Sequence, residues 1–180
     1  MEYGRTLVTG GLRAGILLSA LVASASGFAG ERLAPDFSLP AISDRDATIT
    51  LSAYRGKTVY LDFWSSWCAP CRESLPLLSK LHQEFSGDDF QIVGVNLDAL
   101  PADGRRIVEQ YAIEYPVASD ITGIAAQQFG ASTLPAAFVI NGDGVIQPEL
   151  PQMDKQNISA IKASLLELIE QERQTRPLVN

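Results

Sequence analysis

The chain has 180 residues, of which 46% are hydrophobic and 19% charged, and this composition is typical of a globular protein rather than a disordered one. Its length suits one domain, because domains usually have about 100–200 residues. The formal net charge of −7 argues against a basic surface for nucleic acid, so we expect no nucleic-acid partner.

The first 29 residues differ in character from the rest of the chain. Two arginines precede an apolar run over residues 16–25, and small residues follow it. These are the parts of a secretory signal peptide. The run is short for a membrane-spanning helix, which needs about 20 residues. We predict that residues 1–29 are a signal peptide, cleaved after Ala25 or Ala29, or an uncleaved membrane anchor. Residues 30–180 would then form a domain in the periplasm or elsewhere outside the cytoplasm.

The exported part begins with a predicted β-hairpin. Apolar residues over 37–39 and 49–51 are separated by a polar stretch over 43–46, which is typical of a turn. The next segment, residues 58–64, is continuous, β-branched and aromatic, and this pattern indicates a strand buried on both faces. A helix is expected over residues 69–85, because leucines recur along it at helical spacing.

Strands and helices alternate through the rest of the chain as well. The pattern predicts strands over 90–97, 115–118 and 136–140, helices over 104–111, 121–129 and 159–173, and a short antiparallel return at 145–146 after an Asn-Gly-Asp-Gly turn. Strands that alternate with helices around a buried centre indicate an α/β three-layer sandwich.

Cys68 and Cys71 are the only cysteines in the sequence, and they fall between the strand over 58–64 and the helix that follows. A Cys-x-x-Cys pair in that place is typical of a thioredoxin-like redox site. The other interpretation is a local structural disulfide. Zinc is disfavoured, because a tetrahedral site needs four ligands and the exported part offers one histidine, His82, and no second cysteine pair. We predict no metal and no cofactor.

The two cysteines have different expected roles. The thiolate is the nucleophile in thiol–disulfide exchange, and a helix N-terminus stabilises it. Cys68 precedes the helix and is expected to be the acidic, exposed, attacking thiol, whereas Cys71 is expected to be the sheltered resolving thiol. Pro70 suits the first turn, where its missing N–H costs nothing. Trp67 is expected to lie as a lid beside the disulfide, and both Trp67 and Pro70 are expected to contact the substrate.

Several segments together resemble the exported TlpA/ResA-like thiol-disulfide oxidoreductases of the thioredoxin superfamily. They are residues 34–37 (Ala-Pro-Asp-Phe), 55–57 (Arg-Gly-Lys), 63–72 (Phe-Trp-Ser-Ser-Trp-Cys-Ala-Pro-Cys-Arg), 93–96 (Val-Gly-Val-Asn) and 133–135 (Thr-Leu-Pro). The resemblance implies a thioredoxin-like three-layer α/β/α sandwich with an N-terminal β-hairpin and a central α/β insertion between residues 98 and 129.

The resemblance also assigns roles to residues outside the cysteine pair. Pro135, opposite the cysteines, is expected to be cis and to leave a backbone edge, including that of Leu134, free to bind substrate. Asp62 lies in the buried strand, where an unpaired carboxylate is costly. It matches the thioredoxin aspartate that accepts the proton of the resolving cysteine, and burial raises a carboxyl pKa toward the range useful for a general base. However, Ser74 replaces the family glutamate and Gly94 the thioredoxin lysine, so Asp62 would act without either group.

The implied function is that of an exported reductase of disulfides in client proteins, with electrons supplied by a membrane thiol donor. Apocytochrome c haem-site thiols, during cytochrome c maturation, are one class of client. A disulfide oxidase or isomerase and a thiol peroxidase stay open as alternatives, although the Thr-x-x-Cys peroxidase pattern is replaced by Ser-Ser-Trp-Cys over residues 65–68. A copper chaperone is disfavoured, because there is one histidine and no methionine cluster. We expect a monomer.

Overall fold

The computed structural model describes residues 1, 4, 32–85, 87, 89–148 and 153–175. The expected signal peptide or anchor lies outside the described residues, apart from residues 1 and 4, and so does the chain after residue 175. In the ranges that are described, no helix is both long and apolar enough to cross a membrane.

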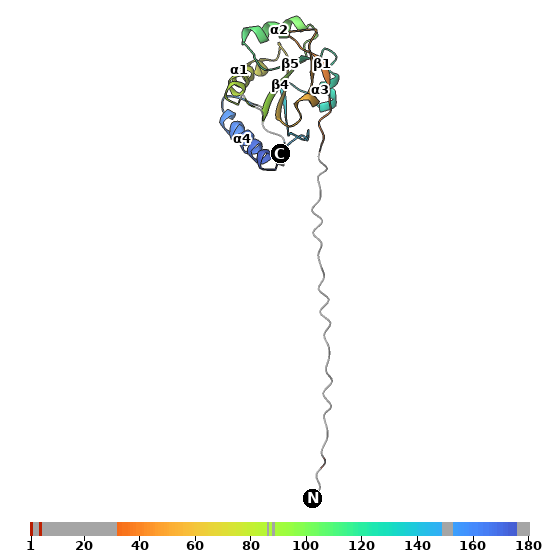
Figure 1. The fold of residues 1–180 in the computed structure, drawn as a ribbon, viewed down its shortest axis with the longest axis vertical. Coiled ribbons are helices and arrows are strands. Elements are labelled where there is room, and N and C mark those ends of the chain that lie inside the picture. Colours follow the sequence, from red (N-terminus) through yellow and green to blue (C-terminus); the bar gives the residue numbers. More distant parts are fainter. Residues whose placement is uncertain (2–3, 5–31, 86, 88, 149–152, 176–180) are drawn as a thin grey trace, which may run out of the picture.

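Within the described residues, a four-stranded mixed sheet forms the centre of the fold (Figure 1). Its strand order is β5-β4-β3-β6, with β3 at Thr58–Trp64, β4 at Phe90–Asn96, β5 at Val117–Ser119 and β6 at Ala136–Ile140. The first three run parallel to one another, and β6 is antiparallel to β3. Every residue of β3 is buried, as its continuous apolar pattern predicts for a central strand.

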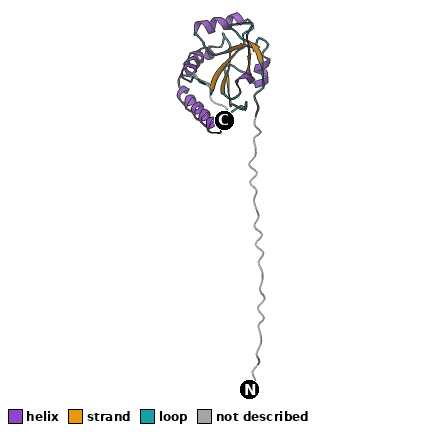
Figure 2. Cartoon of the chain, in the orientation of Figure 1, coloured by secondary structure: helices purple, strands orange, loops and turns teal. Residues whose placement is uncertain are grey.

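Three helices cover one face of the sheet (Figure 2). They are α1 at Ala69–Glu84, α2 at Pro101–Gln110 and α4 at Ile158–Thr175. Alternate side chains of a strand point to opposite faces, so Tyr60 and Trp64 of β3 pack against these helices. Leucines of α1 and isoleucines and leucines of α4 complete this buried cluster.

The other face of the sheet packs against α3 at Ile124–Phe129 and against the N-terminal segment. That segment contains β1 at Ser38–Pro40, β2 at Thr48–Thr50 and the short helix η1 at Leu51–Tyr54. Three phenylalanine rings meet there, with centroids 5.2–5.9 Å apart, and they are Phe63, Phe129 and Phe138. The predicted three-layer α/β/α sandwich with an N-terminal hairpin is therefore confirmed.

The hairpin is joined to the edge of the central sheet. β1 and β2 pair antiparallel, and the polar stretch over residues 43–46 forms the predicted turn between them. Ile42 donates its backbone N–H to the carbonyl of Val117 at 2.8 Å, and Ala41 forms an antiparallel bridge with Ala118. These contacts hold the hairpin beside β5, in the predicted insertion.

The elements of the insertion differ from the predicted boundaries. α2 begins at Pro101 instead of residue 104, because a proline fits the first turn of a helix. β5 begins at Val117 instead of residue 115, since Pro116 has no N–H to donate to a neighbouring strand. α3 begins at Ile124 instead of residue 121, after Gly123, which has the positive φ of 68° that glycine adopts without strain.

The predicted antiparallel return at residues 145–146 is present as short pairings. Val145 forms an isolated bridge with Leu33, whereas Ile146 bridges Ile140. The N–H of Gln147 also donates to the carbonyl of Val139 at 2.8 Å, so the chain runs back antiparallel to β6. The turn before them is present, because the N–H of Gly144 donates to the carbonyl of Asn141 at 2.9 Å.

Candidate active site

The two cysteines form a disulfide at the N-terminus of α1, with an S–S distance of 2.03 Å and a Cα–Cα distance of 5.3 Å. Cys68 is the N-cap residue of the helix, and its backbone is extended, with φ −78° and ψ 103°. The N–H of Cys71 donates to Sγ of Cys68 at 3.2 Å. Pro70 lies in the first turn, as predicted, and this turn contains no acidic residue.

This geometry distinguishes the two sulfurs electrostatically. A helix N-terminus carries a partial positive charge and unpaired N–H donors, and both favour an anion. The Cys71 N–H already points to Cys68, so negative charge is favoured on Cys68 once the disulfide is reduced. The absence of an acidic side chain from the first turn preserves this effect.

The expectation that Cys68 is exposed is wrong for the disulfide form. Cys68 is 4% exposed and Cys71 is fully buried. The Cys68 side chain turns back toward the helix to bond with Cys71, which brings it into the same buried cluster as the leucines of α1. Trp67 is 71% exposed, so an exposed apolar ring comes directly before Cys68, which is almost fully buried.

The loop before β6 lies at the same end of the sheet as the cysteines. The Leu134–Pro135 peptide bond is cis, as the resemblance implies. Ala136 pairs with Phe63 in β3, so Pro135 lies level with the end of the strand that leads to Cys68. Leu134 is half-buried and packs against the cluster that contains both cysteines. Substrate contact by Pro135 and Leu134 stays a prediction.

Asp62 is fully buried and belongs to the side of β3 that faces α1, as do Tyr60 and Trp64. Burial raises the pKa of Tyr60 and of Tyr115, and the negative charge of Asp62 raises both further. The two phenol groups therefore share a low-polarity region with the carboxylate. Cys71 lies on the same side of the sheet, and its deprotonation by Asp62 stays a prediction.

Ser74, which replaces the family glutamate, is 2% exposed in α1. Its hydroxyl donates to the carbonyl of Cys71 at 2.9 Å, so this side chain bonds with the helix backbone. Among the described residues, no group of three or more His, Cys, Asp or Glu side chains lies close enough to hold a metal ion.

Asp98 is a residue of the site that sequence reasoning missed. Its carboxylate accepts the N–H of Ser66 at 3.1 Å on each oxygen, the hydroxyl of Ser66 at 3.0 Å and the amide of Asn96 at 2.9 Å. Asp98 is only 3% exposed. Its position just after β4 could have predicted this role, because the carboxyl ends of neighbouring parallel strands meet at one edge of a sheet. Asp98 thus anchors the loop that carries Trp67 and Cys68.

Comparisons with known proteins agree with this arrangement. The model of the AhpC/TSA family matches residues 31–148. The chain is 31% identical over 102 residues to thiol-disulfide oxidoreductase ResA of Bacillus thuringiensis subsp. konkukian (strain 97-27), covering 57% of this chain and 59% of that relative. It is 29% identical over 134 residues to ResA of Geobacillus thermodenitrificans (strain NG80-2), covering 72% and 76%. The match thus spans about three-fifths of the length of the first of these relatives.

Solved structures show the same fold. A Chlorobium tepidum structure described as a thiol:disulfide interchange protein DsbE has a TM-score of 0.71 and 32% identity, and the match covers 77% of this chain and 96% of that one. A Bacteroides thetaiotaomicron structure described as a protein disulfide isomerase has a TM-score of 0.69, covering 80% and 92%. At 21% identity, the second likeness concerns the fold alone.

Proposed function

Because the chain belongs to the AhpC/TSA family, among its TlpA/ResA-like thioredoxin-fold members, we propose that it is a thiol-disulfide oxidoreductase that reduces disulfides of partner proteins. The observation that carries the proposal is the Cys68–Cys71 disulfide at the N-terminus of α1. An adjacent pair of this kind can open and close without moving the rest of the fold. Leu134, which precedes Pro135 at the same end of the sheet, packs against the cluster that contains both cysteines, and this supports a substrate edge there.

The first step is attack by the Cys68 thiolate on a client disulfide. Sγ of Cys68 bonds to one client sulfur, the client S–S bond breaks, and the other client sulfur leaves as a thiolate that takes up a proton. The Cys71 N–H and the helix N-terminus stabilise the attacking thiolate. The exposed Trp67 ring offers apolar surface to the arriving client.

The second step releases the client. Cys71 loses its proton to Asp62, and its thiolate attacks Sγ of Cys68 in the mixed disulfide. The intermolecular S–S bond breaks, the client sulfur leaves as a thiolate that takes up a proton, and the Cys68–Cys71 disulfide closes. The client gains two electrons and the protein loses two, so a dithiol donor must reduce the protein again.

The predicted signal peptide or anchor supports a location outside the cytoplasm. A reductase in such a compartment needs electrons from the other side of the membrane, and a membrane thiol protein would supply them. Clients would be exported proteins with disulfides, and apocytochrome c in cytochrome c maturation is one candidate.

The decisive experiment traps the mixed disulfide. Cys71→Ser, expressed with its leader, should accumulate covalent complexes with client proteins, which reducing agent releases. Cys68→Ser is the matched control and should trap none, because Cys71 is fully buried. Equal trapping by the two variants, or none by either, would contradict the proposal.

The direction of transfer is tested by the reduction potential. When it is equilibrated with glutathione, a reductase should show a reduction potential well below about −120 mV, the approximate reduction potential of a strong oxidase. A potential near or above about −120 mV would assign the pair to disulfide formation instead. Peroxide turnover by the Cys71→Ser variant would favour the peroxidase alternative.

A further inference from the structure

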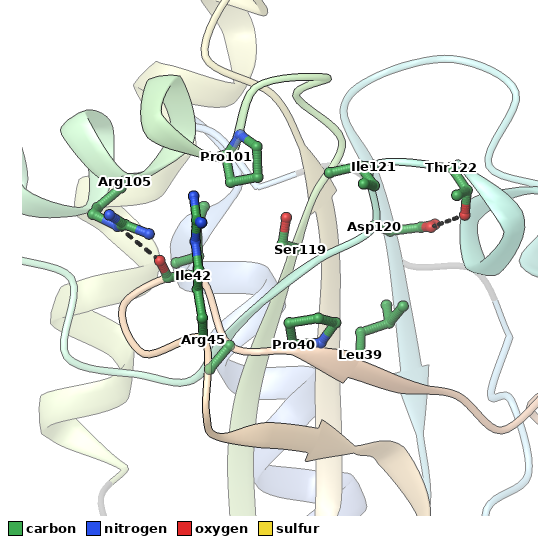
Figure 3. Close-up of a pocket in the computed structure, with 11 residues that line it drawn as sticks. Leu39, Pro40, Ile42, Arg45, Pro101, Arg105, Ser119, Asp120, Ile121 and Thr122 are labelled. Carbon is green, nitrogen blue, oxygen red and sulfur yellow. Dashed lines mark hydrogen bonds between the residues drawn. The ribbon is translucent and has the colours of Figure 1, made fainter.

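A pocket lies beside β5, at the opposite edge of the sheet from β6. Its volume is about 520 Å³, and it opens between the start of α2, the hairpin turn and the loop after β5 (Figure 3). Most of the wall is apolar, with Leu39, Pro101 and Ile121 among its residues. Pockets of about 300–1,000 Å³ with apolar walls and a few polar groups are typical of small-molecule sites. No cysteine lines it, so it is separate from the redox site.

Ser119 gives the pocket a polar group at its base. The residue is 6% exposed, and its Oγ makes no hydrogen bond with any residue that the structure describes. Figure 3 shows this oxygen pointing into the space between Pro101 and Ile121. A buried hydroxyl group without a protein partner can donate to a bound group, so Ser119 is a candidate contact for a ligand of this pocket.

Two arginines supply positive charge at the same pocket. Nε of Arg105 donates to the carbonyl of Ile42 at 2.9 Å, which fixes the guanidinium at the wall (Figure 3). Its terminal nitrogens, and all those of Arg45, have no partner among the described residues, and neither arginine pairs with a described carboxylate. In a chain with a net charge of −7, two unpaired guanidinium groups beside one apolar pocket favour an anionic ligand.

The one acidic residue of the wall, Asp120, offsets one of these two positive charges, so the wall keeps a net positive charge. Asp120 is 1% exposed, and both carboxylate oxygens accept hydrogen bonds from the protein. Oδ1 accepts from the hydroxyl of Thr122 at 3.2 Å, and Oδ2 accepts from the N–H of Ala126 at 3.1 Å. The hydrogen bonds of the Asp120 carboxylate therefore stabilise the start of α3.

We propose that this pocket binds a small molecule with an apolar body and one carboxylate. The apolar body would lie against Leu39, Pro101 and Ile121, and the carboxylate would accept hydrogen bonds from Ser119 and the arginines. Arginine matches a carboxylate in shape as well as charge, because its N–H groups lie in a planar fork. The pocket and the disulfide share no residue, so the Cys68→Ser/Cys71→Ser protein should bind the ligand equally well.

Octanoate is a suitable probe, and amide NMR shifts of the protein at low salt measure its binding. We expect one saturable site, with the shifts concentrated near Ile42, Arg105 and Ser119. Octan-1-ol, which lacks the carboxylate, and acetate, which lacks the apolar body, should each bind at least tenfold more weakly. Ser119→Ala should weaken octanoate binding about tenfold, because it removes a hydrogen bond to a charged group.

Arg45→Gln is the second variant, and because the residue is exposed it should leave the fold intact. It should weaken binding about threefold and reduce its salt dependence, as expected for an exposed charge. Arg106→Gln is the matched control, since Arg106 is on the same helix as Arg105, pairs with Asp103 and does not line the pocket. Equal affinity for octanoate and octan-1-ol, no effect of either pocket variant, or shifts spread over the surface would overturn the proposal. Binding of an acidic peptide without binding of octanoate would overturn it too, in favour of a protein partner.

Discussion

Gly94 on β4 is the parallel-sheet partner of Asp62 on β3, and aromatic rings fill the space beside it. A Cβ at Gly94 would lie 3.2 Å from Nε1 of Trp64 and 3.3 Å from Cε2 of Tyr115. The ring of Tyr115 thus stands where a side chain of residue 94 would begin. The buried carboxylate therefore has phenol and indole rings as neighbours at the place that the resemblance to thioredoxin matches to a lysine.

Gly94→Ala should destabilise the protein, because three neighbouring atoms at 3.2–3.3 Å would have to move. Overpacking of this kind lowers the free energy of unfolding by about 1–3 kcal/mol. Urea unfolding measures it, with Gly87→Ala as the control, since the nearest atom to a Cβ there is 3.9 Å away. A Gly94→Ala protein as stable as the control variant would show that the rings adapt freely.

Asp62→Asn should slow the release of the client and leave the first attack unchanged. The loss of a general base typically slows a proton transfer about 10²-fold or more, and only the second step needs the Cys71 proton removed. Rapid-quench measurements of mixed-disulfide formation and decay separate the two steps. Ser74→Ala is the control, because it removes a buried hydroxyl whose hydrogen bond, in the part of the chain that the structure describes, goes to the Cys71 carbonyl. Equal slowing of both steps would assign Asp62 a structural role.

The protein should lose stability in alkali through Tyr60 and Tyr115. Burial, and then the Asp62 charge, raises the pKa of both phenols. Above about pH 10 the unfolded chain releases these protons and the folded chain keeps them, so the free energy of unfolding falls as pH rises, by up to about 1.4 kcal/mol per pH unit for each tyrosine. Urea unfolding of a Tyr60→Phe/Tyr115→Phe protein should show a shallower decline. At about pH 7 all phenols are neutral, so the difference in stability between the unsubstituted protein and this variant measures the effect of removing the two hydroxyl groups on packing alone. An unchanged slope would contradict the assignment.

Asp98→Ala should loosen the loop before Cys68. It leaves three buried or half-buried donors without their acceptor, two on Ser66 and one on Asn96. We expect the free energy of unfolding to fall by about 2–3 kcal/mol and the attack by Cys68 to slow. Stopped-flow reduction of a model disulfide measures the attack. Asp103→Ala, at an exposed position of α2, is the control and should change stability by less than about 0.5 kcal/mol. Unchanged kinetics in Asp98→Ala would show that the loop holds its shape without the carboxylate.

Local sequence patterns were enough for the cysteine pair and its immediate setting. The Cys-x-x-Cys spacing spans one helical turn, and the apolar run of β3 and the leucines of α1 define the strand and helix on either side. Such features depend on residues a few positions apart, so they can be read without the fold. The buried position of Asp62 followed for the same reason, because it lies within a strand that is apolar on both sides.

The tertiary structure decided what depends on contacts between distant segments. Asp98 meets Ser66 only because β3 and β4 end at one edge, and Tyr115 reaches the side of Asp62 only because β5 pairs with β4 beside Gly94. The almost complete burial of Cys68 and the pocket at Ser119 also depend on such contacts, because side chains from several elements surround each of them. Sequence periodicity shows which residues face a core, whereas the strand order and register determine which of them meet.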